Sequence, residues 1–115
     1  MVKKYTPSQG DIVYLDFNPQ SGHEQRGKRP ALIISNQLFN SHLGLAFACP
    51  ITNTDRNFPF HIKLTNLKTT GFVMCEQMKS LDYKTRKISF VEKVNSEVVE
   101  TALAIVESIL KDSKE

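Results

Sequence analysis

Residues 31–35 read Ala31-Leu32-Ile33-Ile34-Ser35, and this run of four apolar side chains is typical of a strand that is covered on both faces. Upstream, residues 12–17 are rich in β-branched and aromatic side chains and predict a partner strand. Downstream segments bring the predicted set to about six strands: residues 45–49, 60–64, 72–76 and 88–91. In residues 60–64 apolar and polar residues alternate, so this strand is expected to bury one face and to expose His61.

The last predicted element is a helix over residues 96–110. Its apolar residues recur at spacings of three and four, which makes a wide apolar stripe opposite a polar face. Asn95 or Ser96 can cap its N-terminus, and Glu97 suits the positive end of the helix. Short strands followed by one amphipathic helix predict a mainly β fold, a small curled sheet or barrel with the helix packed on it.

The size and composition indicate one folded domain, residues 1–115. Hydrophobic residues make up 40% and charged residues 23%, a globular mixture that excludes a disordered chain. The formal net charge of +3 suits a polyanionic ligand, although many proteins are this basic without one. A domain this small would gain from a further apolar interface with a second copy.

The two cysteines, Cys49 and Cys75, each lie inside an apolar run and lack the spacing of a metal site. They are expected to be buried, reduced thiols. No apolar stretch follows Met1, so no signal peptide is predicted, and no segment is long and apolar enough for a membrane helix. A cytoplasmic location is the resulting expectation.

Residues 18–30, NPQSGHEQRGKRP, do not fit the pattern of a strand or a helix. The segment is long and polar, and Pro and Gly residues interrupt it. Long loops of this kind are often functional, and a solvated hairpin loop is the alternative.

Six motifs occur in one order along the chain: Gly10-Asp11-Ile12-Val13, Asp16-Phe17-Asn18-Pro19, Ser21-Gly22-His23-Glu24-Gln25, Arg29-Pro30-Ala31-Leu32-Ile33-Ile34, Pro50-Ile51-Thr52 and Glu76-Gln77-Met78-Lys79-Ser80-Leu81-Asp82. This series resembles the MazF/PemK/Kid family of toxin ribonucleases, and the resemblance covers nearly the whole chain. It implies an SH3-like barrel with a C-terminal helix and a homodimer that binds single-stranded RNA in a shared groove. It also implies sequence-specific cleavage to 2′,3′-cyclic phosphate and 5′-hydroxyl ends, which inhibits translation and growth, and a cognate antitoxin.

Arg29 and Thr52 are the first candidates for catalysis. A guanidinium group can form two parallel hydrogen bonds to phosphate oxygens, and Pro30 favours an extended backbone at Arg29. A threonine hydroxyl can donate to a phosphate oxygen, although the residue type alone favours an ordinary strand-end Thr. The resemblance assigns a catalytic role to both residues.

His23 and Glu76 are a second candidate pair, because a histidine can transfer protons near neutral pH. One branch of the family has His at position 23 and combines it with Arg and Asp on either side of the later cysteine. Here those two positions are Met74 and Glu76. Another branch has Ser at position 23 and relies mainly on the Arg–Thr pair. We expect no role in the chemistry for His42, interpreted as a loop residue, or for His61.

The remaining candidates are expected to contact RNA. Glu24 and Gln25 would read bases or order the loop, and Tyr14 and Phe17 could stack on bases, with half-buried core packing as the alternative for Tyr14. Basic and polar residues would line the RNA path: Arg26, Lys28, Gln77, Lys79, Ser80 and Arg86. Neither a metal nor another cofactor is expected, because no His, Asp, Glu or Cys cluster has ligand spacing.

Three other functions use the same features differently. A non-catalytic SH3-like module could bind RNA or the ribosome through the same basic surface. A gyrase-poisoning relative on this fold depends on a C-terminal tail with Trp, and this chain has no Trp. A protein-binding adaptor is the third. For a toxin of this family, the antitoxin is expected to present an extended acidic segment with interleaved hydrophobic side chains.

Overall fold

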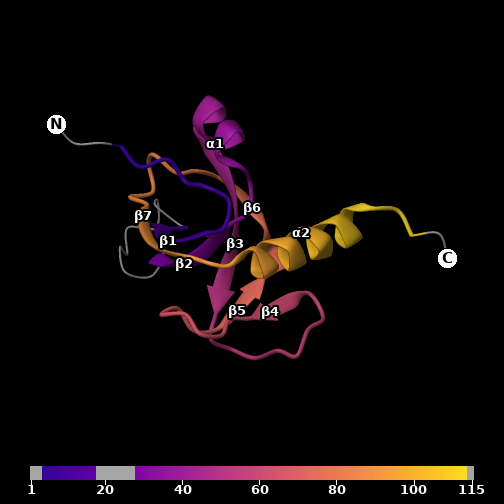
Figure 1. Ribbon diagram of the computed structural model, residues 1–115. Coiled ribbons are helices and arrows are strands. Elements are labelled where there is room, and N and C mark those ends of the chain that lie inside the picture. The colour runs from indigo at the N-terminus through magenta and orange to yellow at the C-terminus, as the bar shows by residue number, and fades with distance from the viewer. Residues whose placement is uncertain (1–3, 18–27, 114–115) are drawn as a thin grey trace.

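The computed structural model describes residues 4–17 and 28–113, and these form seven strands, two α-helices and one 3-10 turn (Figure 1). In chain order the elements are β1 (Asp11–Asp16), β2 (Lys28–Ile33), α1 (Gln37–Leu43), β3 (Leu45–Thr52), β4 (His61–Lys63), β5 (Phe72–Met74), η1 (Cys75–Gln77), β6 (Lys79–Asp82), β7 (Ser89–Lys93) and α2 (Ser96–Leu110). The mainly β fold with a C-terminal amphipathic helix that the sequence predicts is confirmed.

Strand β3 is the centre of the sheet, whose order is β4-β5-β3-β2-β1-β7. One edge of β3 pairs with β2. The other edge is divided, because β6 pairs with residues 45–48 and β5 pairs with residues 51–52. All of these pairs are antiparallel. This division brings the start of β6 and the end of β5 to the same strand, and η1 joins them.

Two strands are longer than the sequence predicts. β2 begins at Lys28 rather than at residue 31, since Lys28, Arg29 and Pro30 pair with β1. β3 continues to Thr52. Both extensions add residues at the end of the sheet where β1 ends and β2 begins.

Helix α1 and strand β6 were not predicted. α1 has only seven residues and exposes Leu38 and Leu43, so it has no continuous apolar face that a pattern could show. Its ends are nevertheless well capped: Asn36 accepts a hydrogen bond from the Phe39 amide at 2.8 Å, and Gly44 takes the left-handed conformation. His42, predicted in a loop, lies in its last turn. In β6 only Leu81 is buried, which is too little for a periodicity.

The sheet has a hydrophobic cluster on each face, because successive residues of a strand point to opposite sides. One cluster packs under α2: Ile12, Leu32, Ile34, Cys49, Ile51, Leu64, Val73, Cys75, Val94 and Ala102. The other cluster fills the opposite face: Val13, Leu15, Phe17, Ala31, Ile33, Ala46, Ala48, Leu81 and Tyr83. Residues 31–34 are all buried, which confirms a strand covered on both faces. Both cysteines are free and buried, as expected.

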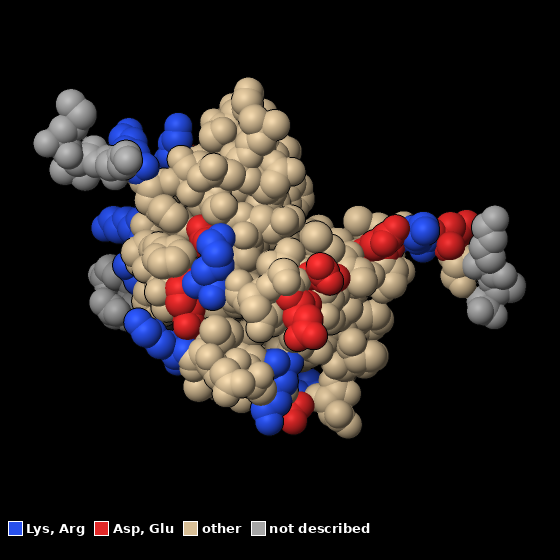
Figure 2. Space-filling view, viewed as in Figure 1, with Lys and Arg blue, Asp and Glu red and all other residues tan. Residues whose placement is uncertain are grey.

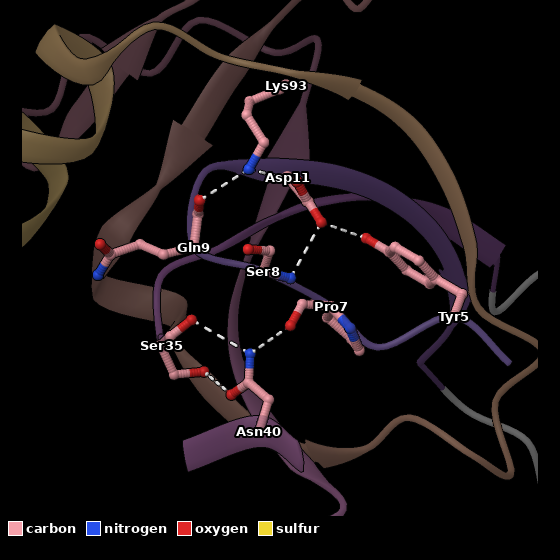
Figure 3. A network of polar contacts seen from close by, with 8 residues as sticks. All are labelled: Tyr5, Pro7, Ser8, Gln9, Asp11, Ser35, Asn40 and Lys93. Carbon is pink, nitrogen blue, oxygen red and sulfur yellow. Dashed lines mark hydrogen bonds and ion pairs between the residues drawn. The ribbon is translucent and has the colours of Figure 1, made fainter. Parts of the chain in front are cut away.

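A polar network ties the N-terminal segment to the sheet and to α1 (Figure 3). Asp11, a buried carboxylate, accepts hydrogen bonds from the Tyr5 hydroxyl and the Ser8 amide and pairs with Lys93 at 2.7 Å. The phenol is buried beside this carboxylate, and both effects raise the pKa of Tyr5 above its ordinary value. Tyr5 therefore stays a neutral donor at physiological pH.

Asn40 is a fully buried polar residue of the same network (Figure 3). Its Nδ2 donates to the Pro7 and Ser35 carbonyl oxygens at 2.8 and 3.2 Å, and its Oδ1 accepts from the Ser35 hydroxyl at 2.6 Å. We expect Asn40→Ala to lower the free energy of unfolding by about 3 kcal/mol, because buried partners lose their hydrogen bonds. Urea denaturation checks this, with the exposed Ser41→Ala as control. A loss no larger than that of the control would contradict it.

Glu92 of β7 anchors the loop before β5. Its carboxylate accepts hydrogen bonds from the Lys68 and Thr69 amides at 3.1 and 2.7 Å. Desolvation opposes ionisation, but the bonds from Thr69 and Lys68 outweigh it and hold the pKa of Glu92 below its ordinary value of 4.5. The stabilisation is therefore complete above pH 4.5 and is lost as the pH falls through the lower folded-state pKa.

We expect Glu92→Gln to reduce this acid-dependent loss of stability. Thermal unfolding of both proteins, measured from pH 7 down to about pH 3, should converge as the pH falls. Glu100→Gln, on the exposed side of α2, is the control and should follow the wild type throughout. If the curves for Glu92→Gln and the wild type stay parallel over the whole range, Glu92 does not have this role.

In the described part of the chain, none of the helices is long and apolar enough to cross a membrane.

Candidate active site at one end of the sheet

The register of β2 and β3 relates the two first candidates. Ala31 pairs with Pro50, the last pair between these strands, and extending this antiparallel register by two residues would set Arg29 opposite Thr52. Residues directly opposite in such a pair share a face of the sheet and lie within reach of each other. Arg29 also pairs with the buried Leu15 of β1, so its side chain leaves from the face that carries the second cluster. From this extension we infer that the Arg29 guanidinium group and the Thr52 hydroxyl lie on one face at the same end of the sheet.

Phe17 and Lys79 complete this end of the sheet. The Arg29 guanidinium carbon lies 5.9 Å from the centre of the Phe17 ring, and the Lys79 ammonium nitrogen lies 6.0 Å from the same centre. Lys79 pairs with Ala48 of β3, which places it on the same face as Thr52. Two cations thus share one aromatic ring. The ring is only 9% exposed, so it offers no free face for a base, and the predicted stacking role of Phe17 is not supported.

Arg86 follows β6 and binds the end of β1. Its Nη1 donates to the carbonyl oxygens of Asp16 and Phe17 at 3.1 and 2.8 Å. In return, its own carbonyl oxygen accepts from the Asp16 amide at 3.1 Å. The predicted place on the RNA path does not match this geometry, since the guanidinium group is partly buried and already binds the backbone.

Thr52 has its hydroxyl hydrogen available. The Oγ1 atom accepts a hydrogen bond from the Thr54 amide at 3.1 Å, so its O–H can still donate to a ligand. Gly71 crosses directly behind the Thr52 backbone with φ +120°, a conformation that favours glycine. A Cβ at position 71 would lie 2.4 Å from the Thr52 carbonyl oxygen. Only glycine therefore fits at this crossing.

The structure corrects the expectation that His61 is exposed. Its side chain is 3% exposed, and its Nε2 lies 3.0 Å from Glu76 Oε2. The reason is that η1, which carries Glu76, packs against β4, and the centre of the Phe58 ring lies 5.2 Å from the centre of the imidazole. His61 also pairs with Met74, the position where the family branch described above has arginine. The carboxylate of Glu76 is thus already held by a histidine that the sequence alone did not connect to it.

The other predicted contacts divide between the two faces. Tyr14 and Ser80 are exposed but are adjacent to Leu15 and Lys79, so they leave their strands on the face opposite Arg29. Lys28 is partly buried at the start of β2, and Gln77 is exposed in η1. His23, Glu24, Gln25 and Arg26 lie outside the described residues. Figure 2 shows that Lys and Arg side chains gather along the margin where β1 and β7 lie in Figure 1, whereas acidic groups gather over α2.

The cysteines are suited to packing rather than to chemistry. A hydrogen bond with Cys75, together with burial, raises the pKa of the Cys49 thiol and keeps it neutral. Within residues 4–17 and 28–113, no group of three His, Cys, Asp or Glu residues could hold a metal ion.

Comparison with known proteins shows that this fold is that of MazF toxins and then identifies the family. Among solved structures, MazF of Deinococcus radiodurans (Form-I) superposes with a TM-score of 0.83 at 35% identity, and covers 93% of this chain and 98% of its own. Its MazE–MazF complex (Form-II) gives 0.83 at 30% identity over 96% and 100%. Residues 8–110 match the family described as PemK-like, MazF-like toxin of type II toxin–antitoxin system. The chain belongs to this family.

Two curated relatives are similar over most of their length. The endoribonuclease toxin ChpB of Escherichia coli K12 is 35% identical over 119 residues, which cover 96% of this chain and 100% of the relative. The endoribonuclease toxin MazF of the same organism is 34% identical over 86 residues, which cover 75% and 78%.

Proposed function

We propose that this chain is an endoribonuclease toxin that cuts single-stranded RNA through the RNA's own 2′-hydroxyl, without a metal ion. The observation that carries the proposal is that Arg29 and Lys79 lie beside one aromatic ring, at the end of the sheet where the β2–β3 register, extended by two residues, would set Thr52 opposite Arg29. Relatives that are 34% and 35% identical to this chain are named endoribonuclease toxins. The products would be 2′,3′-cyclic phosphate and 5′-hydroxyl ends, and cleavage of mRNA would stop translation and growth.

The chemistry assigns a role to each group. Attack of the 2′-oxygen on phosphorus forms a pentacovalent phosphorane with extra negative charge, and the P–O5′ bond then breaks. Arg29 would hold two phosphate oxygens through parallel hydrogen bonds, and Thr52 would donate a third. Lys79 adds a second positive charge, so the charge stabilisation that a metal ion could supply is available from side chains.

Two proton transfers accompany these steps: one from the 2′-hydroxyl and one to the 5′-oxygen. Arg29 cannot act as a base, because a guanidinium group stays protonated. His23 is the candidate for the proton acceptor or donor in these transfers. Glu76 is a weaker candidate than the sequence indicated, because its carboxylate is paired with His61.

The test is to incubate the pure protein with labelled single-stranded RNA in EDTA and to analyse the ends of the fragments. We expect discrete cuts with cyclic-phosphate and 5′-hydroxyl ends. Binding without cleavage would instead support the RNA-binding module. Cleavage only after a divalent cation is added would contradict the metal-independent mechanism.

We further propose that the toxin works in the cytoplasm as a homodimer. The C-terminal part of α2 extends beyond the sheet in Figure 1, and it exposes Leu103, Ile109 and Leu110. A second copy could cover this apolar surface and extend the RNA groove across two subunits.

The cognate antitoxin should compete with RNA for this groove. A peptide that mimics RNA there should be extended and acidic, with hydrophobic side chains between the charges. We expect an acidic antitoxin peptide and a non-cleavable 2′-deoxy RNA analogue to displace each other from the dimer. The affinity of the peptide should fall as the salt concentration rises, because charges are screened. Part of the affinity should remain at high salt, because the apolar contacts are not screened. Simultaneous, independent binding of both ligands would show that inhibition does not occur by covering the groove.

A further inference from the structure

We propose that Phe17 is a positioning residue that holds Arg29 and Lys79 as one phosphate clamp, and that Arg86 fixes Phe17 in place. This inference rests on the proposed ribonuclease function and deepens it, since it names the residues that prepare the two cations for the RNA backbone. Phe17 and Arg86 act through Arg29 and Lys79 and touch no reacting atom.

The ring of Phe17 is the common contact of the two cations. The Arg29 guanidinium carbon and the Lys79 ammonium nitrogen lie 5.9 and 6.0 Å from its centre, within the range in which the negative face of a ring attracts a cation. The ring belongs to the buried cluster that also contains Leu15 and Ala48. It therefore cannot turn away without disturbing the core, and it limits where both side chains can go.

The described part of the chain offers the two cations no competing anion. Among residues 4–17 and 28–113, neither Arg29 nor Lys79 forms an ion pair with a carboxylate. Two like charges beside one ring repel each other, and a phosphate group between or beside them would relieve that repulsion. The arrangement is thus suited to an incoming phosphate: the ring offsets part of the repulsion and leaves both groups free to bind.

Arg86 holds Phe17 and the end of β1 in place. Its Nη1 holds the carbonyl oxygens of Asp16 and Phe17, and its carbonyl oxygen accepts from the Asp16 amide, so the end of β1 is bound from both directions. A lysine at position 86 would keep the charge, but a single ammonium group cannot reproduce the planar guanidinium contact. Geometry, rather than charge, is what Arg86 provides.

The experiment replaces Phe17 by phenylalanine analogues with one, two and three ring fluorines, which weaken the negative face of the ring and change its shape little. The measurements are kcat, KM and affinity for a 2′-deoxy RNA analogue. We expect a stepwise fall in kcat/KM and in affinity, reaching roughly tenfold for the trifluoro ring and for Phe17→Leu. The same analogues at Phe47, which packs against Phe39 elsewhere on β3, are the control and should change neither quantity.

Arg86→Lys provides the second arm. We expect it to lower kcat by about tenfold while the salt dependence of RNA binding stays that of the wild type. If Arg86 instead binds a phosphate, Arg86→Lys should keep its activity and Arg86→Gln should reduce the salt slope by about one. That result, or fluorinated Phe17 proteins with unchanged kcat/KM and affinity, would overturn the inference. An inactive wild type would contradict the proposed function instead, and the affinity series would still test the clamp.

Discussion

Replacing Arg29 with alanine should remove nearly all RNA cleavage and leave the protein folded. Arg29 joins β1 and β2 through its backbone pair with Leu15, and alanine keeps that backbone. What is lost is the planar group that holds two phosphate oxygens in the transition state. We expect the single-turnover cleavage rate to fall by about a thousandfold or more.

Arg29→Lys should recover little of this loss, because a single ammonium group cannot reproduce the two parallel hydrogen bonds. Lys111→Ala is the matched control: it removes one positive charge from the far end of α2 and should keep full activity. Thermal unfolding of all three variants shows whether the fold is intact. An Arg29→Ala protein that is folded and cuts RNA at a rate near that of the wild type would refute the assignment.

Thr52→Val should lower turnover by about a hundredfold, the usual scale for the loss of one transition-state donor. Valine has nearly the same shape and removes only the hydroxyl. The Thr54 amide also loses its acceptor, but it is exposed and can bind water, so stability should change little. Turnover of labelled RNA at saturating concentration measures the effect.

Thr52→Ser is the rescue control for this variant. It keeps the hydroxyl and loses only a methyl group, so most of the activity should remain. If Thr52→Val and Thr52→Ser are equally active and form the same product ends, Thr52 belongs to the scaffold. If both are equally inactive, the methyl group rather than the hydroxyl is required.

Continuous or periodic apolar runs made much of the fold predictable from the sequence. Residues 31–34 are buried on both faces, and α2 spans the fifteen residues that its three- and four-residue spacing indicates. Elements held by caps and by pairing rather than by an apolar pattern were missed. α1 depends on Asn36 and Gly44, and β6 depends on its pairing with the first half of β3.

The sequence offered candidate site residues one by one but not their arrangement. Arg29 and Thr52 were chosen through the family resemblance, whereas their relative position depends on how far the β2–β3 register extends. An aromatic residue at the end of a strand has the same sequence signal whether it faces RNA or supports two cations, so the position of Phe17 required the structure. His61 was misjudged because alternation within one strand cannot show that η1 covers the polar side.

Gly71 lies against the backbone of Thr52 so closely that no side chain can be added without moving one of them. If the chain arrests growth, cells that express its gene will survive only when a mutation inactivates the product. Survivors should therefore include substitutions at codon 71 as well as at codons 29 and 52. Such alleles should yield a folded but inactive toxin that still binds its antitoxin, since the strain acts on the backbone of Thr52, whose hydroxyl is the proposed catalytic donor. The lack of space for a side chain at position 71 would then appear as a set of inactivating mutations in the gene.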